Sequence, residues 1–332
     1  MLNGHLTFLK TKTLSSIVTW SFLILMVLLL GLTILAQIDQ SQLNDENIKT
    51  KYLQDNSQFI EVNNMNIHVI DSHPHQIHRS KQLETLVLIH GTASSLHTWD
   101  PWVSLIDDSY RVIRLDLPGF GLTGHDPNGQ YEIQDDVFII NNLLEKLNVE
   151  NAHIIGSSLG GRIAWQYSLE FPNQTRSLTL INALGYPQDS WPPAIQMGQI
   201  PMIDQMMKYL TSRLIFKISL QDIYADHQLI TEKTIDRYFE LAQYGENPIA
   251  FPQRVKARLD KDAELIKRIQ TPTLILWGQK DRFFPVANAY QFNKDILGSK
   301  LKVFSEVGHL PMEEAPKASL YATLNFIQTL EN

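Results

Sequence analysis

The clearest chemical signal in the sequence is a serine that stands between glycines. Residues 156–160 read Gly-Ser-Ser-Leu-Gly and separate a short apolar run from a run with helical spacing. In a G-x-S-x-G pattern at a strand-to-helix turn, the middle residue, here Ser158, sits on a strained elbow, and Gly156 and Gly160 allow the close backbone approach. The helix that begins at Leu159 directs free N–H groups toward negative charge that develops beside the serine. The pattern predicts that Ser158 is a nucleophile.

An acid and a histidine follow two later apolar runs. Asp281 comes just after residues 273–277, and His309 comes just after residues 301–304. If these runs are parallel strands, their carboxyl ends meet at one edge of the sheet, and the two side chains can converge on Ser158. A serine hydroxyl is a weak nucleophile, so His309 would accept its proton and later return it to the leaving group. Asp281 would hold the imidazole in the useful tautomer.

An upstream loop offers a site for the oxyanion of such a reaction. The sequence His90-Gly91-Thr92 follows the apolar run 85–89. We assign the two oxyanion donors to the backbone N–H groups of Thr92 and Leu159. His90 is expected to orient this loop rather than to act as a base, and Gly91 is expected to form its turn.

Strand-like and helix-like runs alternate around these residues. Two extended runs, 59–62 and 65–70, are joined at Asn63-Asn64 and predict a hairpin. Short apolar runs typical of strands buried on both faces follow at 85–90, 111–117, 152–156, 177–182, 273–277 and 301–304, with helical spacing at 133–147, 159–171 and 318–330. The order predicts an α/β fold with a mostly parallel central sheet flanked by helices.

One stretch interrupts this alternation after the sixth strand. Residues 185–269 contain no convincing strand but include Trp191-Pro192-Pro193 and four methionines, Met197, Met202, Met206 and Met207. We predict a helical cap inserted between two parts of the core, 58–184 and 270–332. Its methionine and aromatic side chains could line an acyl pocket or could simply pack the cap helices on one another.

The N-terminal region has the composition of a membrane segment. Residues 17–36 are almost unbroken in apolar character, and 20 helical residues span roughly 30 Å, the hydrocarbon thickness of a bilayer. Lys10 and Lys12 precede this run, so the positive-inside rule predicts a cytoplasmic N-terminus and an exported domain, periplasmic or extracellular. We therefore predict an anchor over residues 1–38 and a polar spacer over residues 39–57. A signal peptide cleaved near Ala36, which would release a secreted enzyme, is the alternative.

Composition excludes several classes of protein. The 332 residues carry a net charge of −7, which argues against a nucleic-acid binder, and 44% are hydrophobic, which argues against disorder. The absence of cysteine removes disulfides, thiolate metal sites and a cysteine nucleophile. A cluster of Asp71, His73, His75 and His78 fits an exposed loop better than a metal site. No metal or cofactor is expected, and the sequence leaves the oligomeric state open.

Taken together, these motifs resemble the α/β-hydrolase-fold enzymes of the esterase/lipase type. The resemblance rests on His90-Gly91, the run Asp116-Leu117-Pro118-Gly119-Phe120-Gly121, the Ser158 elbow, Asp281 and Gly308-His309, and it covers roughly residues 58–330. The order Ser, Asp, His along the chain is the order of that family. Dehalogenases and epoxide hydrolases of the family carry aspartate at the elbow, where this chain has Ser158.

The resemblance implies a serine hydrolase without metal or organic cofactor. We expect cleavage of a carboxylic ester, of a small molecule or a lipid-like substrate, through an acyl-enzyme. Because the family spans many chemistries, hydrolysis of a carbon-carbon bond or of an amide or peptide on the same triad stays open. A noncatalytic, membrane-tethered binding module is the hypothesis from another class.

Overall fold

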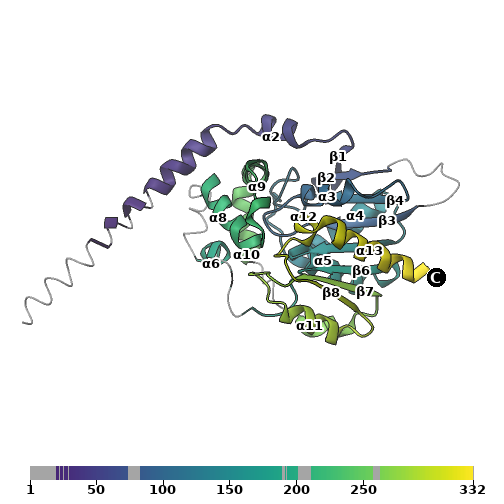
Figure 1. Ribbon diagram of the computed structural model, residues 1–332. Helices are drawn as coiled ribbons and strands as arrows, with labels where there is room; N and C mark the ends of the chain where they lie inside the picture. Colours follow the sequence, from purple (N-terminus) through teal and green to yellow (C-terminus); the bar gives the residue numbers. More distant parts are fainter. Residues whose placement is uncertain are drawn as a thin grey trace, which may run out of the picture.

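The computed structural model describes residues 20–73, 83–188, 191, 193–200, 211–256 and 262–331, except residues 22, 25 and 29. Within these residues the strands form one eight-stranded sheet in the order β1-β2-β4-β3-β5-β6-β7-β8 (Figure 1). The strands are β1 Ser57–Val62, β2 Met65–Asp71, β3 Glu84–Ile89, β4 Tyr110–Leu115, β5 Ala152–Ser157, β6 Thr175–Ile181, β7 Thr273–Gly278 and β8 Lys300–Phe304.

The sheet is parallel from β4 to β8, and β2 pairs with both β1 and β4 in antiparallel fashion. The predicted hairpin is present, because Asn63 and Asn64 both adopt positive φ, 51° and 64°, as a tight turn between twisted strands requires. The α/β fold with a mostly parallel, helix-flanked sheet is therefore confirmed.

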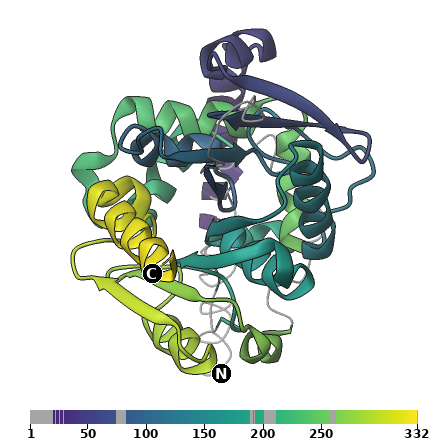
Figure 2. The same ribbon diagram turned by 90° about the vertical axis from the view of Figure 1, so that its right-hand side faces the viewer.

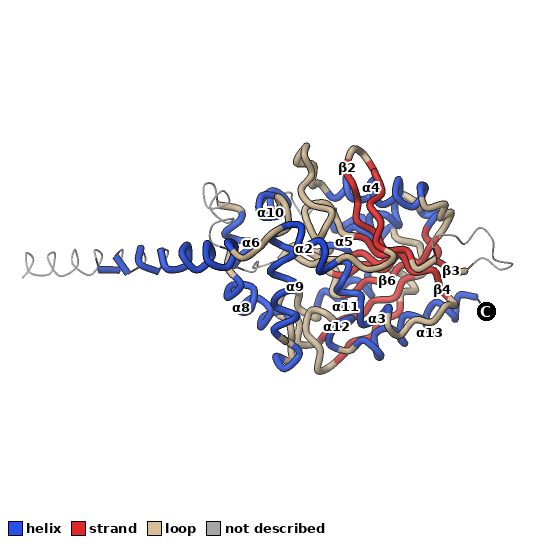
Figure 3. Tube along the Cα trace, turned by 90° about the horizontal axis from the view of Figure 1, so that it is seen from above, coloured by secondary structure: helices blue, strands red, loops and turns tan. Residues whose placement is uncertain are grey.

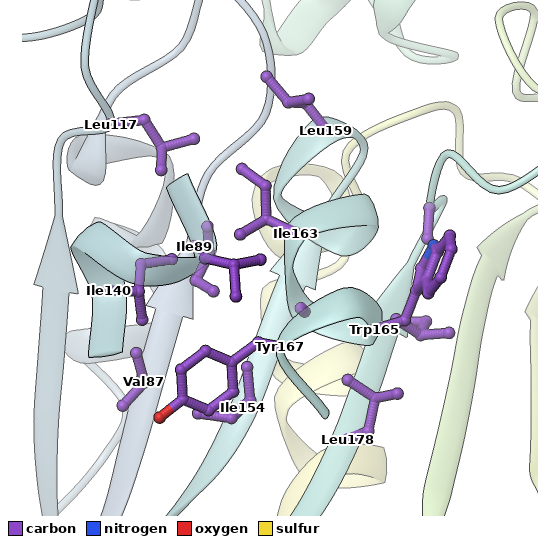
Figure 4. Close-up of a cluster of buried hydrophobic side chains, with 14 of the residues drawn as sticks. Val87, Ile89, Leu117, Ile140, Ile154, Leu159, Ile163, Trp165, Tyr167 and Leu178 are labelled. Carbon is purple, nitrogen blue, oxygen red and sulfur yellow. The ribbon is translucent and has the colours of Figure 1, made fainter. Parts of the chain in front are cut away.

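Apolar residues of the central strands pack on both faces of the sheet. In β3, Val87 and Ile89 belong to one buried cluster, and Leu86 and Leu88 belong to a second, as the two-residue period of a strand dictates. Helices α4 Ile133–Lys146, α5 Leu159–Glu170 and α11 Ala287–Asp295 cover the first cluster, part of which is drawn in Figure 4. Helices α3 Asp100–Val103, α12 Pro311–Glu314 and α13 Pro316–Glu331 cover the second, and Figure 2 shows α13 and α4 on opposite sides of the sheet.

The described residues of the predicted interruption between β6 and β7 include several helices. They are α6 Pro193–Gly198, α8 Arg213–Ile223, α9 Glu232–Gln243 and α10 Asn247–Lys256, and the described residues of this insertion contain no strand. We call this insertion the cap. Met202, Met206, Met207 and the side chain of Met197, which could line an acyl pocket or pack the cap helices on one another, lie outside the described residues.

Two ion pairs, one buried and one partly buried, join the cap to the core. The Arg254 guanidinium on α10 donates to both carboxylate oxygens of Asp136 on α4, at 2.8 and 2.7 Å. Arg237 on α9 donates to Glu313 on α12 at 2.6 Å. Because a buried charge is costly without its partner, these contacts fix the position of the cap on the sheet.

The described N-terminal residues are helical, and this helix, which includes Met26–Ser41, extends away from the body of the protein (Figures 1 and 3). Among the described residues, no single helix combines the length and apolar character needed to cross a bilayer. The helix Met26–Ser41 meets that test only together with the next helix, α2 Asp45–Tyr52, from which it is bent by 67°. Residues 1–19, 22, 25 and 29 of the predicted anchor lie outside the described part of the chain.

The predicted polar spacer contains α2. The side chain of Asn44 caps this helix by accepting from the N–H of Glu46, and acids in its first turn and lysines in its last turn suit the helix dipole. Ile48 and Tyr52 are buried against Leu122 and Leu241. The spacer is therefore packed on the body, a feature that its polar composition does not indicate.

Candidate active site

Ser158 occupies the sharp turn between β5 and α5. Its φ of 56° and ψ of −116° are strained for a residue with a side chain. A Cβ atom at Gly156 would lie 2.1 Å from the carbonyl oxygen of Gly160, and one at Gly160 would lie 2.3 Å from that of Ile89. Only glycine fits at these two positions, so the sequence pattern and the backbone of the elbow agree.

Asp281 and His309 are in direct contact at the neighbouring strand ends. Nδ1 of His309 lies 2.8 Å from Oδ2 of Asp281, and both residues are buried. Oδ1 of Asp281 accepts from the backbone N–H groups of Phe283 and Phe284, at 2.7 and 3.1 Å. Because a carboxylate accepts, His309 donates through Nδ1, which leaves Nε2 free to accept a proton.

The rings of Phe283 and Phe284 both contact the His309 imidazole. Their centroids lie 5.2 and 5.3 Å from the imidazole centroid. Among the described residues, no hydrogen bond joins the Ser158 hydroxyl to His309. Such contacts often form only when substrate binds, so the separation is compatible with general-base chemistry.

Asn182, which the sequence analysis did not single out, ties the strand ends together. This fully buried residue follows β6, and its Nδ2 donates to Oδ2 of Asp281 at 2.5 Å and to the Gly308 carbonyl at 3.5 Å. Its Oδ1 accepts from the N–H of Gly278 at 3.2 Å. The available signal was a polar residue that ends an otherwise apolar run, SLTLIN, at the edge where the site was expected.

The loop after β3 lies directly against the nucleophile. A Cβ atom at Gly91 would lie 2.9 Å from Cβ of Ser158, so a side chain there would displace the serine. Leu159 begins α5, where backbone N–H groups lack helical partners, and Thr92 follows Gly91 in the loop. The assignment of the oxyanion donors to Thr92 and Leu159 stays a prediction.

His90 braces this loop as a neutral ring. Its Nδ1 donates to the Gly91 carbonyl at 2.7 Å, and its Nε2 accepts from the N–H of Leu117 at 2.9 Å. Complete burial lowers the pKa of His90 to about 4. With both nitrogens engaged, His90 orients the loop and is not available as a base.

Asp116 fixes the turn after β4. Its carboxylate accepts from the backbone N–H groups of Leu96 and Leu122 and from the His68 ring, at 2.7, 2.8 and 2.7 Å. Burial by itself would raise the pKa of Asp116, but the hydrogen bond and charge of His68 hold that pKa below its usual value. A Cβ atom at Gly121 would lie 2.1 Å from the Asp116 carboxyl carbon, which explains the glycine.

The loop that carries His309 is fastened to the cap. The N–H of His309 donates to the carbonyl of Ile223 at the end of α8, at 2.8 Å. The Glu314 carboxylate accepts from the N–H groups of Gly308 and Ala225, at 3.0 and 2.7 Å. The cap therefore contributes directly to the placement of the histidine.

The expected loop at residues 71–78 is described only in part. Asp71 ends β2 and accepts from the buried Arg111 guanidinium at 2.7 Å, whereas His75 and His78 lie outside the described residues. No group of three or more metal-ligating side chains gathers within the described ranges.

Comparison with known proteins places these features in context. The sequence model of the alpha/beta hydrolase fold matches residues 84–316. The chain is 30% identical over 246 residues to the uncharacterized hydrolase YugF of Bacillus subtilis, covering 74% of this chain and 90% of that one. It is 25% identical to the 2-hydroxy-6-oxononadienedioate/2-hydroxy-6-oxononatrienedioate hydrolase of Escherichia coli K12, covering 74% and 87%.

Solved structures show the same fold. A meta-cleavage product hydrolase from Pseudomonas fluorescens IP01 superposes with a TM-score of 0.67 at 23% identity, covering 80% of this chain and 95% of that one. A bacterial membrane phospholipase A superposes with a TM-score of 0.69 at 22% identity, covering 97% and 99%.

Proposed function

The chain belongs to the alpha/beta hydrolase fold family, and from this premise we propose that it is a serine hydrolase that cleaves carboxylic esters through an acyl-enzyme intermediate. The observation that carries the proposal is the Asp281–His309 pair, held by Asn182 at the strand ends beside the Ser158 elbow. This arrangement presents Nε2 of His309 as the base that a serine nucleophile needs.

Each step of the reaction has an assigned group. Oγ of Ser158 attacks the carbonyl carbon while its proton passes to Nε2 of His309, and the N–H groups of Thr92 and Leu159 stabilise the oxyanion, each by on the order of 3 kcal/mol. The C–O bond then breaks, and His309 returns the proton to the departing alkoxide. Water attacks the acyl-enzyme with His309 again as base, and this step releases the acid and restores Ser158.

The test is hydrolysis of p-nitrophenyl esters with short and long acyl chains. Ser158→Ala should reduce the rate by a factor of about a thousand or more and abolish labelling by a fluorophosphonate. Ser157→Ala is the matched control, because this buried neighbour precedes the elbow position and should keep full activity. Equal rates in wild type and Ser158→Ala would reject the mechanism, and a folded chain that takes no label would favour a noncatalytic binding module.

A carbon-carbon bond hydrolase is the second candidate. It is favoured by the similarity to the Escherichia coli hydrolase, which extends over 87% of that protein. The same serine, histidine and aspartate would serve a ketone substrate, since the differing contacts belong to the cap and pocket. A panel that sets 2-hydroxy-6-oxo-dienoates against esters and amides separates the candidates by kcat/KM.

We further propose that residues 17–36 anchor the chain in a membrane, with the N-terminus cytoplasmic and the catalytic domain exported. The support is the apolar run, the lysines before it and the exposed apolar side chains of the helix, such as Met26, Leu30 and Ile34. External protease should digest the domain once an outer barrier is permeabilised. Protection under that condition would indicate the opposite orientation, with the domain in the cytoplasm. A mature chain that begins near residue 37 would indicate a cleaved signal peptide.

A further inference from the structure

The segment that follows the proposed anchor is bonded to the cap. Oδ2 of Asp39 accepts from the N–H of Arg213 at the start of α8, at 2.9 Å. Nε2 of Gln40 donates to the Thr211 carbonyl and to Oε1 of Gln243, at 3.3 and 3.2 Å. Asp39 lies three residues beyond Ala36, or about 5 Å along a helix. The start of α8 therefore lies within about one helical turn of the end of the apolar run.

Helix α2 adds further contacts between the segment after the proposed anchor and the cap. Ile48 and Tyr52 are buried against cap residue Leu241 and its neighbour Leu122. The Glu240 carboxylate on α9 accepts from the Lys51 ammonium and the Tyr52 hydroxyl, at 2.7 and 2.8 Å. Because two successive segments are bonded to the cap, the direction of the anchor helix sets the orientation of the cap.

The cap surface beside this junction is apolar in part, and it lies next to the ion pairs that Arg213 forms with Glu232 and Asp236. Leu214 and Ile218 lie one turn apart on α8 and are 46% and 54% exposed, and Lys217 lies between them. Ile200, just after α6, is 46% exposed, and Ile249 on α10 is 37% exposed. The exposed face of α8 becomes polar at its other end, at Gln221 and Asp222. In Figures 1 and 3, α6, α8 and α10 lie at the end of the body from which the N-terminal helix projects.

We propose that this surface, which we call the cap ridge (Ile200, Leu214, Ile218 and Ile249), lies in the interfacial layer of the bilayer that holds the anchor. The inference rests on the proposed membrane anchor. A bilayer is the occupant because the ridge lies at the end of the body from which the described N-terminal helix projects with its exposed apolar side chains, close to the Asp39–Arg213 contact. The stem of Lys217 can lie along the ridge while its ammonium, which is exposed and 4.0 Å from the Glu232 carboxylate, reaches lipid phosphates. The cap, rather than the antiparallel edge of the sheet, then faces the membrane.

The absence of cysteine makes this orientation directly measurable. Single substitutions Leu214→Cys and Ile218→Cys in the full chain would carry a polarity-sensitive fluorophore, with the protein in vesicles of phosphatidylcholine and phosphatidylglycerol. Leu297→Cys and Tyr321→Cys are matched controls, because these side chains are 89% and 69% exposed outside the cap. Fluorophosphonate labelling at Ser158 would verify that each variant is folded.

The proposal predicts that shallow spin-labelled lipids quench the probes on the cap ridge and that aqueous iodide quenches them about fivefold less than the control probes, as burial by 5–10 Å requires. Equal iodide quenching at Ile218 and Leu297 in a membrane-bound, active chain would overturn the inference and leave the proposed function intact. Protection of Ile218 from both quenchers would indicate a protein partner and would also overturn it. A chain that carbonate extracts from the vesicles would overturn the anchor and this inference together.

Discussion

At the scale of single residues, the site depends on an asparagine that has no place in the proposed reaction. Asn182 donates to Oδ2 of Asp281, which also accepts from His309, and Oδ1 of Asn182 accepts a hydrogen bond from the N–H of Gly278. One amide side chain thereby links the ends of β6 and β7 and the loop after β8. Its effect on the chemistry would pass through Asp281, so Asn182 is a positioning residue.

Asn182→Ala should lower kcat toward a soluble ester by about 30-fold, because loss of a hydrogen bond to a charged group costs about 2 kcal/mol. KM should change little, since the amide does not reach the acyl carbon that Ser158 attacks. Steady-state kinetics with p-nitrophenyl acetate and the rate of fluorophosphonate labelling measure the effect.

The control for this substitution is Asn293→Ala, a half-buried asparagine near the end of α11 that bonds Ser299. It should keep the wild-type kcat. An unchanged kcat in Asn182→Ala, or an equal loss in both variants, would show that Asn182 does not position Asp281.

The residues of the site differ in how far sequence alone predicts them. Ser158 has a local signature in its flanking glycines, and Asp281 and His309 follow recognisable strands. Asn182 ends a recognisable apolar run, but nothing in that run indicates its contact with Asp281, which arises from the pairing of β6 with β7, 99 residues apart. Contacts that depend on strand order cannot be read from local spacing.

At the scale of elements, the cap is held through α12 to the loop that carries His309. Oε1 of Glu313 accepts from Thr98 and Tyr238, at 2.6 and 2.8 Å, and Oε2 accepts from Arg237 and Tyr224, at 2.6 and 2.5 Å. Burial and the adjacent Glu313 charge raise the pKa of Tyr224, so its hydroxyl stays a donor. Two cap helices thus meet one carboxylate four residues after His309.

Glu313→Gln should destabilise the protein by about 3 kcal/mol, because it leaves the largely buried Arg237 guanidinium without its counter-charge. The measurement is urea unfolding followed by circular dichroism. The control is Glu306→Gln, which breaks the exposed Lys280–Glu306 pair and should change stability by less than about 0.5 kcal/mol. Equal small effects in both variants would mean that the cap does not depend on this carboxylate.

The elements themselves follow from apolar periodicity to different degrees. The buried strands and helices α4, α5 and α13 lie within a few residues of the predicted ranges, because burial on both faces of the sheet leaves unbroken apolar runs. Helix α2 was missed as a packed element because only Ile48 and Tyr52 of its eight residues are buried. Two buried side chains are too few to produce a periodic signal.

At the scale of the whole molecule, the mean hydropathy of −0.14 averages an apolar N-terminal segment with a more polar hydrolase body. Apolar side chains of the N-terminal helix are exposed, whereas those of the hydrolase body form clusters on the two faces of the sheet. After residue 36 the chain holds 26 basic and 35 acidic residues, a net charge of −9. Because an anionic membrane repels this acidic body, most of the body is expected to stay in water, and the cap ridge is the part proposed to contact the membrane.

The packing of α2 on the body predicts that the folded hydrolase body begins before α2 and not after it. A chain that begins at residue 37 keeps α2 and the contacts of Asp39 and Gln40, whereas one that begins at residue 53 loses all of them. The shorter chain should be less stable by about 3 kcal/mol or more, because burial of a large apolar side chain contributes about 1.5–3 kcal/mol and both Ile48 and Tyr52 are removed.

Urea unfolding and hydrolysis of a soluble ester compare the two chains. The chain from residue 37 should match the full-length rate, because the anchor contributes no group to the proposed reaction. Equal stability of the two chains would mean that α2 is only a tether. In that case the anchor could not set the orientation of the cap, since the firm junction between them is α2 packed on Leu122 and Leu241.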